Sequence, residues 1–308
     1  MPASHSISPS PAPPVAPLWR LRTRALELNR TLVMGIVNIT PDSFSDGGAF
    51  LRPEAAVAHA LKLLDEGADL LDLGAESTRP GVNVATNPTV TAEEEQARLL
   101  PVLEGILKAR PRAVLSIDTY KAATARAALA AGAEIINDVS GLTWDADLAA
   151  LCAEAQCGLV LMHTRGLPSQ WSAQSRLSAD ELIATVESGL AASLATAMQA
   201  GIAADAIVLD PGYGFGKRFE ENYALLARQA RLLTLGRPLL AGVSRKSFLG
   251  KTLAPLYGGD TAPIAARETA GIAAMVAVIL HGARIVRVHS VRPAVEAARI
   301  ADAILAQS

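Results

Sequence analysis

The chain has 308 residues, of which 50% are hydrophobic and 19% are charged. This composition excludes a wholly disordered protein, because it supplies enough apolar surface for a large core. Lys and Arg total 28 and Asp and Glu total 30, so the net charge is −2. Nucleic-acid binding is therefore not expected as the main task, since there is no basic excess to neutralise phosphates.

The N-terminal segment and the two cysteines set further limits. Residues 1–18 are rich in Pro, Ser and Ala, and they predict a flexible tail ahead of a single domain over residues 19–308. The longest apolar run, Ile272–Leu280, is about half of the ~20 residues that cross a bilayer, so we expect a cytoplasmic protein without membrane contact. Cys152 and Cys157 match neither a disulfide framework nor a common zinc pattern, and are interpreted as small residues near a helix end.

From residue 31 onward, short apolar runs alternate with stretches of helical period. The runs that predict strands are Thr31–Ile39, Ala68–Gly74, Ala113–Ile117, Glu134–Ile136, Gly158–Met162, Ala206–Leu209, Leu239–Val243 and Arg284–Val288. The predicted helices are Pro53–Glu66, one opened by the capping box Thr91–Glu94, Tyr120–Ala131, Asp145–Gln156, one opened by the capping box Ser178–Glu181, Glu220–Thr234, Ala262–His281 and Val291–Ala306. Together they form eight strand-then-helix units.

The eight units predict an α/β fold, namely a single (β/α)8 or TIM barrel. Strands that are apolar almost throughout are typical of a parallel sheet that is buried on both faces. An open doubly wound sheet is the alternative, but no GxGxxG sequence follows the first strand and no change of composition divides the chain. Trp19–Arg30, ahead of the first strand, is expected to form a short N-terminal hairpin at the bottom of the barrel.

Polar residues follow the predicted strands, at the end where barrel enzymes carry their active sites. They are Asn38, Glu76–Thr78, Asp118, Asn137–Asp138, His163, Asp210, Ser244–Lys246 and Arg287–His289. Taken singly, each is equally well explained as a helix cap or an ion-pair partner. As a set they favour a binding site at the mouth of the barrel.

The basic members of this set favour an anionic ligand. Lys246, Arg287 and His289 follow the last two strands, where barrels often bind phosphate, and Arg79 adds a further positive charge. No GxSxG, HExxH or Walker sequence is present, so the common nucleophile, zinc-protease and P-loop chemistries find no support.

The acidic and amide members favour a second kind of ligand group. Asp118, Asn137 and Asp210 supply acceptors and one amide, which suit a nitrogen heterocycle with several N–H groups. The glycine-rich run Asp210–Lys217 is interpreted as close approach of the backbone to a flat ligand, with a flexible loop as the alternative.

Eight ordered motifs in this chain resemble those of the dihydropteroate synthase family. They are Val33–Gly48, Asp72–Gly81, Ser116–Thr119, Ile136–Gly141, Leu161–His163, Leu209–Gly212, Gly242–Ser247 and Arg287–His289. The resemblance covers about residues 31 to 303. Departures are modest: Tyr213 replaces a common Phe, residues after His163 differ from the usual motif, and the segment 82–90 is longer than in many relatives.

The resemblance implies a transferase of folate biosynthesis. It would condense 6-hydroxymethyl-7,8-dihydropterin diphosphate with 4-aminobenzoate, and release 7,8-dihydropteroate and diphosphate. The residues implied at the diphosphate are Thr78, Arg287 and His289, with Asn38 helping to hold Mg²⁺ there. Those implied around the pterin are Asp118, Asn137, Met162, Asp210 and Lys246. Those implied around the aminobenzoate are Phe44, Arg79, Pro80, Phe215 and Ser244. Catalytic roles fall to Asp118, Lys246 and Arg287.

Two other functions remain open at this point. A pterin-dependent methyltransferase would share the barrel and the acidic residues, but it would not need the diphosphate site that Arg287–His289 favours. A non-catalytic, pterin-binding relative is the third reading, and the presence of all the pterin residues disfavours it. The family resemblance and the almost wholly apolar stretch Ala262–His281 also predict a homodimer packed through the late helices.

Overall fold

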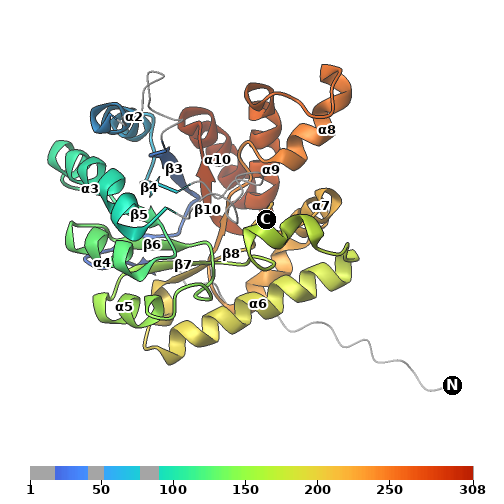
Figure 1. Ribbon diagram of the computed structural model, residues 1–308. Coiled ribbons are helices and arrows are strands. Elements are labelled where there is room, and N and C mark those ends of the chain that lie inside the picture. The colour runs from blue at the N-terminus through green and yellow to red at the C-terminus, as the bar shows by residue number, and fades with distance from the viewer. Residues whose placement is uncertain (1–17, 41–51, 77–89, 308) are drawn as a thin grey trace.

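Eight parallel strands close into a barrel in the computed structural model, which describes residues 18–40, 52–76 and 90–307 (Figure 1). The strands are β3 (Leu32–Asn38), β4 (Leu70–Gly74), β5 (Leu115–Asp118), β6 (Ile135–Asp138), β7 (Gly158–Met162), β8 (Ile207–Asp210), β9 (Leu239–Ala241) and β10 (Ala283–Val288). Neighbours in sequence are neighbours in the sheet, and β10 pairs with β3 to complete the barrel. The predicted (β/α)8 fold is confirmed, whereas the predicted tail falls almost wholly outside the described residues.

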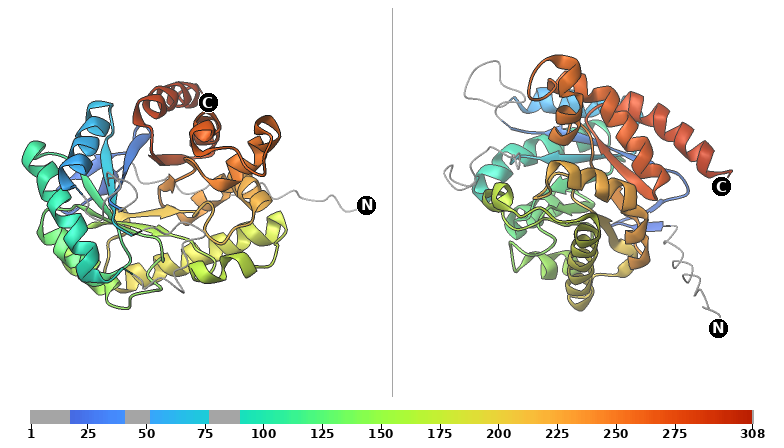
Figure 2. Two further views of the ribbon diagram at one scale, coloured as in Figure 1. Left: turned by 45° about the horizontal axis from the view of Figure 1, so that its top comes forward. Right: turned by 90° about the vertical axis from the view of Figure 1, so that its right-hand side faces the viewer.

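Helices surround the barrel, as Figures 1 and 2 show. They are α2 (Pro53–Asp65), α3 (Ala92–Ala109), α4 (Ala122–Ala130), α5 (Leu148–Ala155), α6 (Ala179–Gln199), α7 (Phe219–Arg228), α8 (Ser247–Tyr257), α9 (Glu268–Leu280) and α10 (Val291–Leu305). Both predicted capping boxes are present, at Thr91 and at Ser178. Among these described helices, none combines the length and the apolar character that a membrane crossing requires.

Two of the predicted helices are each divided in the structure. The stretch 220–234 becomes α7 followed by the 3-10 helix η3 (Gln229–Leu235), and the stretch 262–281 becomes the 3-10 helix η4 (Ile264–Arg267) followed by α9. Pro263 explains the late start of the second, because a residue before proline is disfavoured in helical conformation. The sequence also missed α8, whose apolar pattern is interrupted by Gly250 and Pro255.

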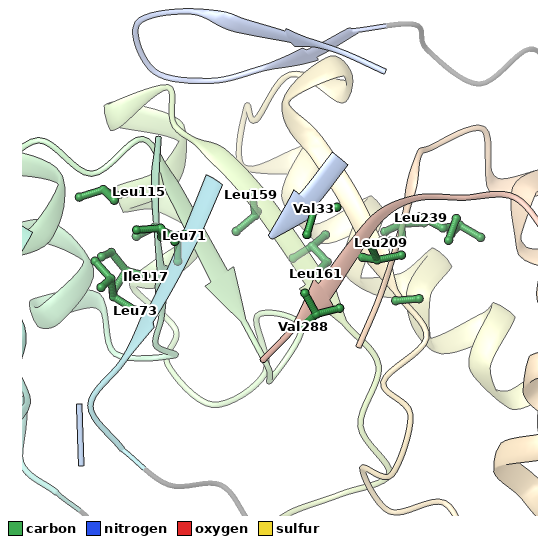
Figure 3. Close-up of a cluster of buried hydrophobic side chains, with 14 of the residues drawn as sticks. Val33, Leu71, Leu73, Leu115, Ile117, Leu159, Leu161, Leu209, Leu239 and Val288 are labelled. Atoms are coloured by element: carbon green, nitrogen blue, oxygen red, sulfur yellow. The ribbon is translucent and has the colours of Figure 1, made fainter. Parts of the chain in front are cut away.

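The strands separate two apolar layers, because successive side chains of a strand point to opposite faces. The outer layer packs against the helices and includes Val33, Leu71, Leu73, Leu115, Ile117, Leu159, Leu161, Leu209, Leu239 and Val288 (Figure 3). The inner layer fills the lower barrel with Met34, Leu70, Val114, Ile135, Val160, Val208, Leu240 and Ile285. The upper barrel is therefore the part that remains for polar side chains.

A two-stranded hairpin joins this inner layer, as predicted. Strands β1 (Leu18–Arg20) and β2 (Ala25–Glu27) pair in antiparallel fashion. Trp19 is fully buried within the inner layer, and its Nε1 donates to the carbonyl oxygen of Ala206 at 2.9 Å. The hairpin thus closes the bottom of the barrel and leaves the carboxyl ends of the strands as its open mouth.

Candidate active site

Strand alternation explains why polar residues gather inside the upper barrel. Each position two residues beyond an inward apolar side chain points inward again. On the eight strands these positions hold Ile36, Asp72, Ser116, Asn137, Met162, Asp210, Gly242 and Arg287. They form a largely polar layer, in which Ile36 and Met162 are apolar, directly above the apolar layer that plugs the barrel.

Asp72 links three strands of this polar layer. It lies on β4 with 0% of its surface exposed. One oxygen, Oδ1, accepts from Ser116 Oγ at 2.6 Å, whereas Oδ2 accepts from Asn137 Nδ2 at 2.9 Å and from Arg287 Nε at 2.6 Å. Sequence reasoning gave Asp72 no role. One signal could have revealed it: Asp72 is a charged residue within an otherwise apolar predicted strand. A charge buried there needs a partner, which indicates an ion pair inside the barrel.

Arg287 and Asp118 lie together at the top of the layer. Nη2 of Arg287 donates to Oδ2 of Asp118 at 2.9 Å. Burial raises the pKa of Asp118 to about 7, although the Arg287 charge opposes that rise. Burial works against the charge of Arg287, but Asp72 and Asp118 outweigh it and the pKa of Arg287 is raised. The arginine is therefore a permanent cation held between two carboxyl groups.

The glycine-rich loop after β8 is held by a buried lysine. Lys217 Nζ donates to the carbonyl oxygens of His163 at 3.0 Å, Gly212 at 2.8 Å and Phe215 at 3.2 Å. Burial lowers the pKa of Lys217 to about 7. Gly212 has φ +70°, and a Cβ there would come within 2.0 Å of the His163 carbonyl oxygen. The flexible-loop alternative is therefore not supported, because this backbone is tied in place.

Asp210 lies at the base of that loop, at the end of β8. Its Oδ1 accepts from the Gly212 backbone N–H at 2.7 Å, and burial raises its pKa. Lys246, the residue before α8, lies near enough to Asp210 to interact with its charge. Its Nζ lies 4.1 Å from the centroid of the Phe215 ring, and burial lowers its pKa to about 8. An acceptor, a cation and an aromatic face thus meet at one side of the mouth.

Phe215 is supported from behind by the segment that follows β7. Trp171, in the 3-10 helix η1 (Pro168–Ala173), meets the Phe215 ring edge-on with centroids 5.3 Å apart. Arg165 in the same segment pairs with buried Glu221 at 3.2 Å. Residues 164–166, where the sequence departs from the usual motif, are therefore part of the segment that packs against Phe215. Sequence reasoning missed Trp171.

Of the remaining predicted site residues, some lie within the described chain and others lie outside it. Ser244 Oγ and His289 Nδ1 are 3.0 Å apart, which brings the predicted aminobenzoate and diphosphate groups into contact. Asn38 ends β3, where it is half-buried. Four predicted residues, Phe44, Thr78, Arg79 and Pro80, lie outside the described residues. Within the described ranges, no group of three or more His, Cys, Asp or Glu side chains is arranged to hold a metal.

Two strand-end residues, Asp138 and His163, do not line the mouth, and a third, Glu76, is held in an ion pair. Asp138 points outward, and its carboxylate accepts from the backbone N–H groups of Ser140 and Leu142 as a turn cap. His163 packs against Gly189 of α6, where burial lowers its pKa to about 2. Glu76 forms an ion pair with Lys121. The expectation that every strand end converges on one site is therefore wrong for Asp138 and His163, because strand alternation turns them toward the helices.

The polar-mouthed barrel matches a family of known enzymes. Residues 34–289 match the family model described as pterin binding enzyme. The dihydropteroate synthase of Mycobacterium leprae is 43% identical over 275 residues, which are 89% of this chain and 93% of that protein. The Xanthomonas albilineans dihydropteroate synthase, solved with 4-aminobenzoic acid, is similar with TM-score 0.82 and 41% identity over 94% of this chain and 98% of that one. The Yersinia pestis dihydropteroate synthase, solved with a sulfonamide drug, gives TM-score 0.83 and 37% identity over 94% and 100%.

Fold and site thus define a pterin-binding barrel enzyme, and the relatives narrow the class further. The chain belongs to the dihydropteroate synthase family. It is a transferase of folate biosynthesis that condenses a pterin diphosphate with 4-aminobenzoate. The methyltransferase and non-catalytic alternatives find no support among these relatives, which are synthases.

Proposed function

We propose that the inward-facing polar layer divides the synthase reaction among its residues, with the pterin on one side of the mouth and its diphosphate on the other. The observation that carries this proposal is a continuous hydrogen-bonded layer, in which Asp72 joins Asn137 to Arg287 and Arg287 in turn binds Asp118. A cation for the diphosphate and acceptors for the heterocycle are thereby held at fixed positions relative to each other.

The pterin side is assigned to Asp118, Asn137, Asp210 and Lys246, with Met162 packing against the ring. Arg287 contacts only Oδ2 of Asp118, and Gly212 contacts only Oδ1 of Asp210. Each carboxylate therefore has a second oxygen that can accept from an N–H of the heterocycle. Lys246 supplies the donor that a ring carbonyl or ring nitrogen requires.

The diphosphate side is assigned to Arg287 and His289, with Thr78 as a further contact. Asn38 would hold Mg²⁺ there, since its amide carbonyl is a hard oxygen donor at the end of β3 and Mg²⁺ takes few protein ligands beside phosphate oxygens. When bound, Mg²⁺ would neutralise negative charge on the diphosphate. Arg287 remains charged at every accessible pH and stabilises the leaving diphosphate as its bond to carbon breaks.

The protein then has to stabilise the pterin as positive charge develops on it. Asp118 and Asp210 face the ring as acceptors, and their negative charge grows more favourable as the ring becomes cationic. The amine of 4-aminobenzoate attacks the carbon that the diphosphate leaves, so no enzyme nucleophile is needed. Phe215 and Ser244, with Phe44, Arg79 and Pro80, are assigned to hold the aminobenzoate.

A homodimer packed through the late helices is part of the proposal. Large apolar side chains are exposed on neighbouring elements there: Leu256 and Tyr257 on α8, Ile264 on η4, Leu280 on α9, and Ile300 and Ile304 on α10. A surface of this kind is typical of a subunit interface. We also assign the enzyme to the cytoplasm, in keeping with two buried cysteines that remain thiols.

The experiment that tests this function measures diphosphate release by purified protein. Release should require the pterin diphosphate, 4-aminobenzoate and Mg²⁺ together, and it should fall sharply in Arg287→Ala. Release that is unaffected by Arg287→Ala would refute the assignment of the diphosphate side. Release that needs no divalent metal would refute the assignment of Asn38.

A further inference from the structure

Asp72 is not assigned to the pterin, the diphosphate or the aminobenzoate. It nevertheless contacts two residues that are assigned to substrate binding. It is fully buried, and its carboxylate accepts from Asn137, Arg287 and Ser116. An ionised carboxylate out of water is costly unless cations and donors surround it. Here one cation and two neutral donors do so, and two of the three are assigned to the substrate.

We propose that Asp72 is a positioning residue: it determines which atoms of the substrate site donate hydrogen bonds and which atoms accept them. It would touch neither the pterin nor the diphosphate. It acts by allowing Asn137 and Arg287 only one orientation each before substrate arrives. This inference rests on the proposed assignment of Asn137 and Arg287 to substrate binding.

The effect on Asn137 follows from the chemistry of an amide. An asparagine side chain has an acceptor and a donor end of nearly the same shape, and only its partners decide which way it points. The Asp72 carboxylate only accepts, so it binds the Nδ2 end, at 2.9 Å. The Oδ1 end is then turned away from Asp72 and is available to a ring N–H. Without the carboxylate, both orientations of the amide become accessible.

The effect on Arg287 follows from the fork shape of a guanidinium. Nε and Nη2 share one edge of the group, and this edge is occupied by Asp72 at 2.6 Å and Asp118 at 2.9 Å. The edge formed by Nη1 and the second N–H of Nη2 has no partner among the described residues. That edge matches the spacing of two phosphate oxygens. Asp72 therefore directs the free edge of Arg287 toward the anion.

The decisive variant is Asp72→Asn, which keeps the volume but replaces one acceptor oxygen by a donor. The new amide can no longer serve Asn137 and Arg287 as a charged acceptor. Isothermal calorimetry with 6-hydroxymethylpterin, and separately with inorganic diphosphate plus Mg²⁺, should show both affinities lowered by about tenfold. Unchanged affinity for both ligands in the folded variant would overturn the proposal.

A matched control lies at the other end of the same strand. Asp69 directly precedes β4 and also pairs with an arginine, Arg30, at the bottom of the barrel. Asp69→Asn therefore removes a comparable carboxylate and should leave both ligand affinities unchanged. An equal loss of affinity in Asp69→Asn would assign the effect of Asp72→Asn to general destabilisation and would overturn the proposal.

The pH profile separates positioning from a merely structural role. The charged groups that act on Asp118 are Arg287, Asp72, Glu95 and Lys246. With Asp72 neutral, one repulsive charge is lost and Arg287 pairs with Asp118 alone, so the pKa of Asp118 should fall. The acid limb of pterin binding should move to lower pH in Asp72→Asn and stay in place in Asp69→Asn. An unmoved limb in Asp72→Asn would contradict the proposal.

Three further variants cover the remaining outcomes. If circular dichroism shows that Asp72→Asn does not fold, Ser116→Ala decides, because it frees Oδ1 of Asp72 and keeps the charge. Pterin affinity should then fall by about threefold, and an unchanged affinity would overturn the proposal.

Asn137→Ala and Arg287→Ala test the assignment of these two residues to substrate binding, on which the proposal rests. If they weaken binding and Asp72→Asn does not, Asp72 has no such role; if they also leave binding unchanged, the assigned site is itself wrong.

Discussion

Burial gives the side chains of the mouth an acid–base character that the same residues lack in water. It raises the pKa of Asp118 to about 7 and lowers the pKa of Lys246 to about 8. The two groups therefore change charge within a narrow range around neutrality. A site that needs Asp118 as an anion and Lys246 as a cation therefore works only within a narrow pH range.

Pterin affinity should accordingly pass through a maximum between pH 7 and 8. Below this range Asp118 gains a proton and loses its value as a charged acceptor, and above it Lys246 loses its charge. Binding titrations across the neutral range check this expectation. Asp118→Asn should change the acid limb, to which Asp210 also contributes, and should leave the alkaline limb. A flat profile in the unaltered enzyme would contradict the assignment.

Asp210→Asn should keep the fold and weaken pterin binding by about 1–3 kcal/mol, because it spoils a charge-assisted hydrogen bond. Calorimetry gives the affinity, and thermal unfolding confirms that the barrel persists. The matched control is Asp138→Asn, at a strand end that faces the helices and caps a turn. It should lower stability without altering pterin affinity. Equal affinity in Asp210→Asn and the unaltered enzyme would reduce Asp210 to a turn cap.

Single residues also mark the limit of what the sequence predicts. Asp118, Asn137 and Asp210 were found because each lies at or next to the end of a strand, and the structure shows that each faces the barrel axis. Asp138 and His163 sit one residue further on, and strand alternation turns them the other way. Asp72 was missed because its partner Arg287 is 215 positions distant in the chain. A pattern of local spacing has no access to such a contact.

Among the elements, the two supports of the glycine-rich loop stand out. Lys217 ties the loop through three carbonyl oxygens, and Trp171 holds the Phe215 ring edge-on. The strands and most helices were predictable, since an unbroken period specifies each of them. The helix α8 and the 3-10 helix η1 were not predictable, because glycine, proline and polar residues interrupt the helical repeat of their apolar residues. Tertiary contacts determine where these two helices form.

Trp171→Ala should raise the KM for 4-aminobenzoate by a factor of about 3–10, corresponding to the ~1 kcal/mol that an aromatic pair contributes. Phe215 loses its edge contact and samples more orientations. The affinity for the pterin should stay unchanged, because the pterin residues lie on strand ends and beside α8. Trp171→Phe, which keeps a ring at the edge, should retain most of the activity toward aminobenzoate. An unchanged KM in Trp171→Ala would remove Trp171 from the support.

At the scale of the whole molecule, six of the nine large apolar side chains that are exposed among the described residues lie between residues 256 and 304. Ile300 on α10 is 65% exposed, and Leu280 on α9 is 41% exposed. Since α9 and α10 pack against each other, we propose that these residues contribute to one apolar face. Such a face is stable in water when a second copy covers it.

Ile300→Glu should therefore convert the proposed dimer into a monomer, because a charge would have to be buried without a partner. Light scattering at micromolar concentration measures the change. Met198→Glu, on α6 and 52% exposed, is the matched control and should leave the dimer intact. A monomer in the unaltered protein would remove the proposed interface altogether.

The seam between β3 and β10 has a consequence for biosynthesis. The barrel closes only when the last strand pairs with the first barrel strand, and the same event brings Arg287 to Asp72. A nascent chain that has emerged as far as β9 would thus carry two unpaired sheet edges and an incomplete mouth. Such a chain would depend on chaperones to avoid aggregation. Turnover would begin only after the ribosome has released nearly the entire polypeptide, so truncated products would be inert rather than weakly active.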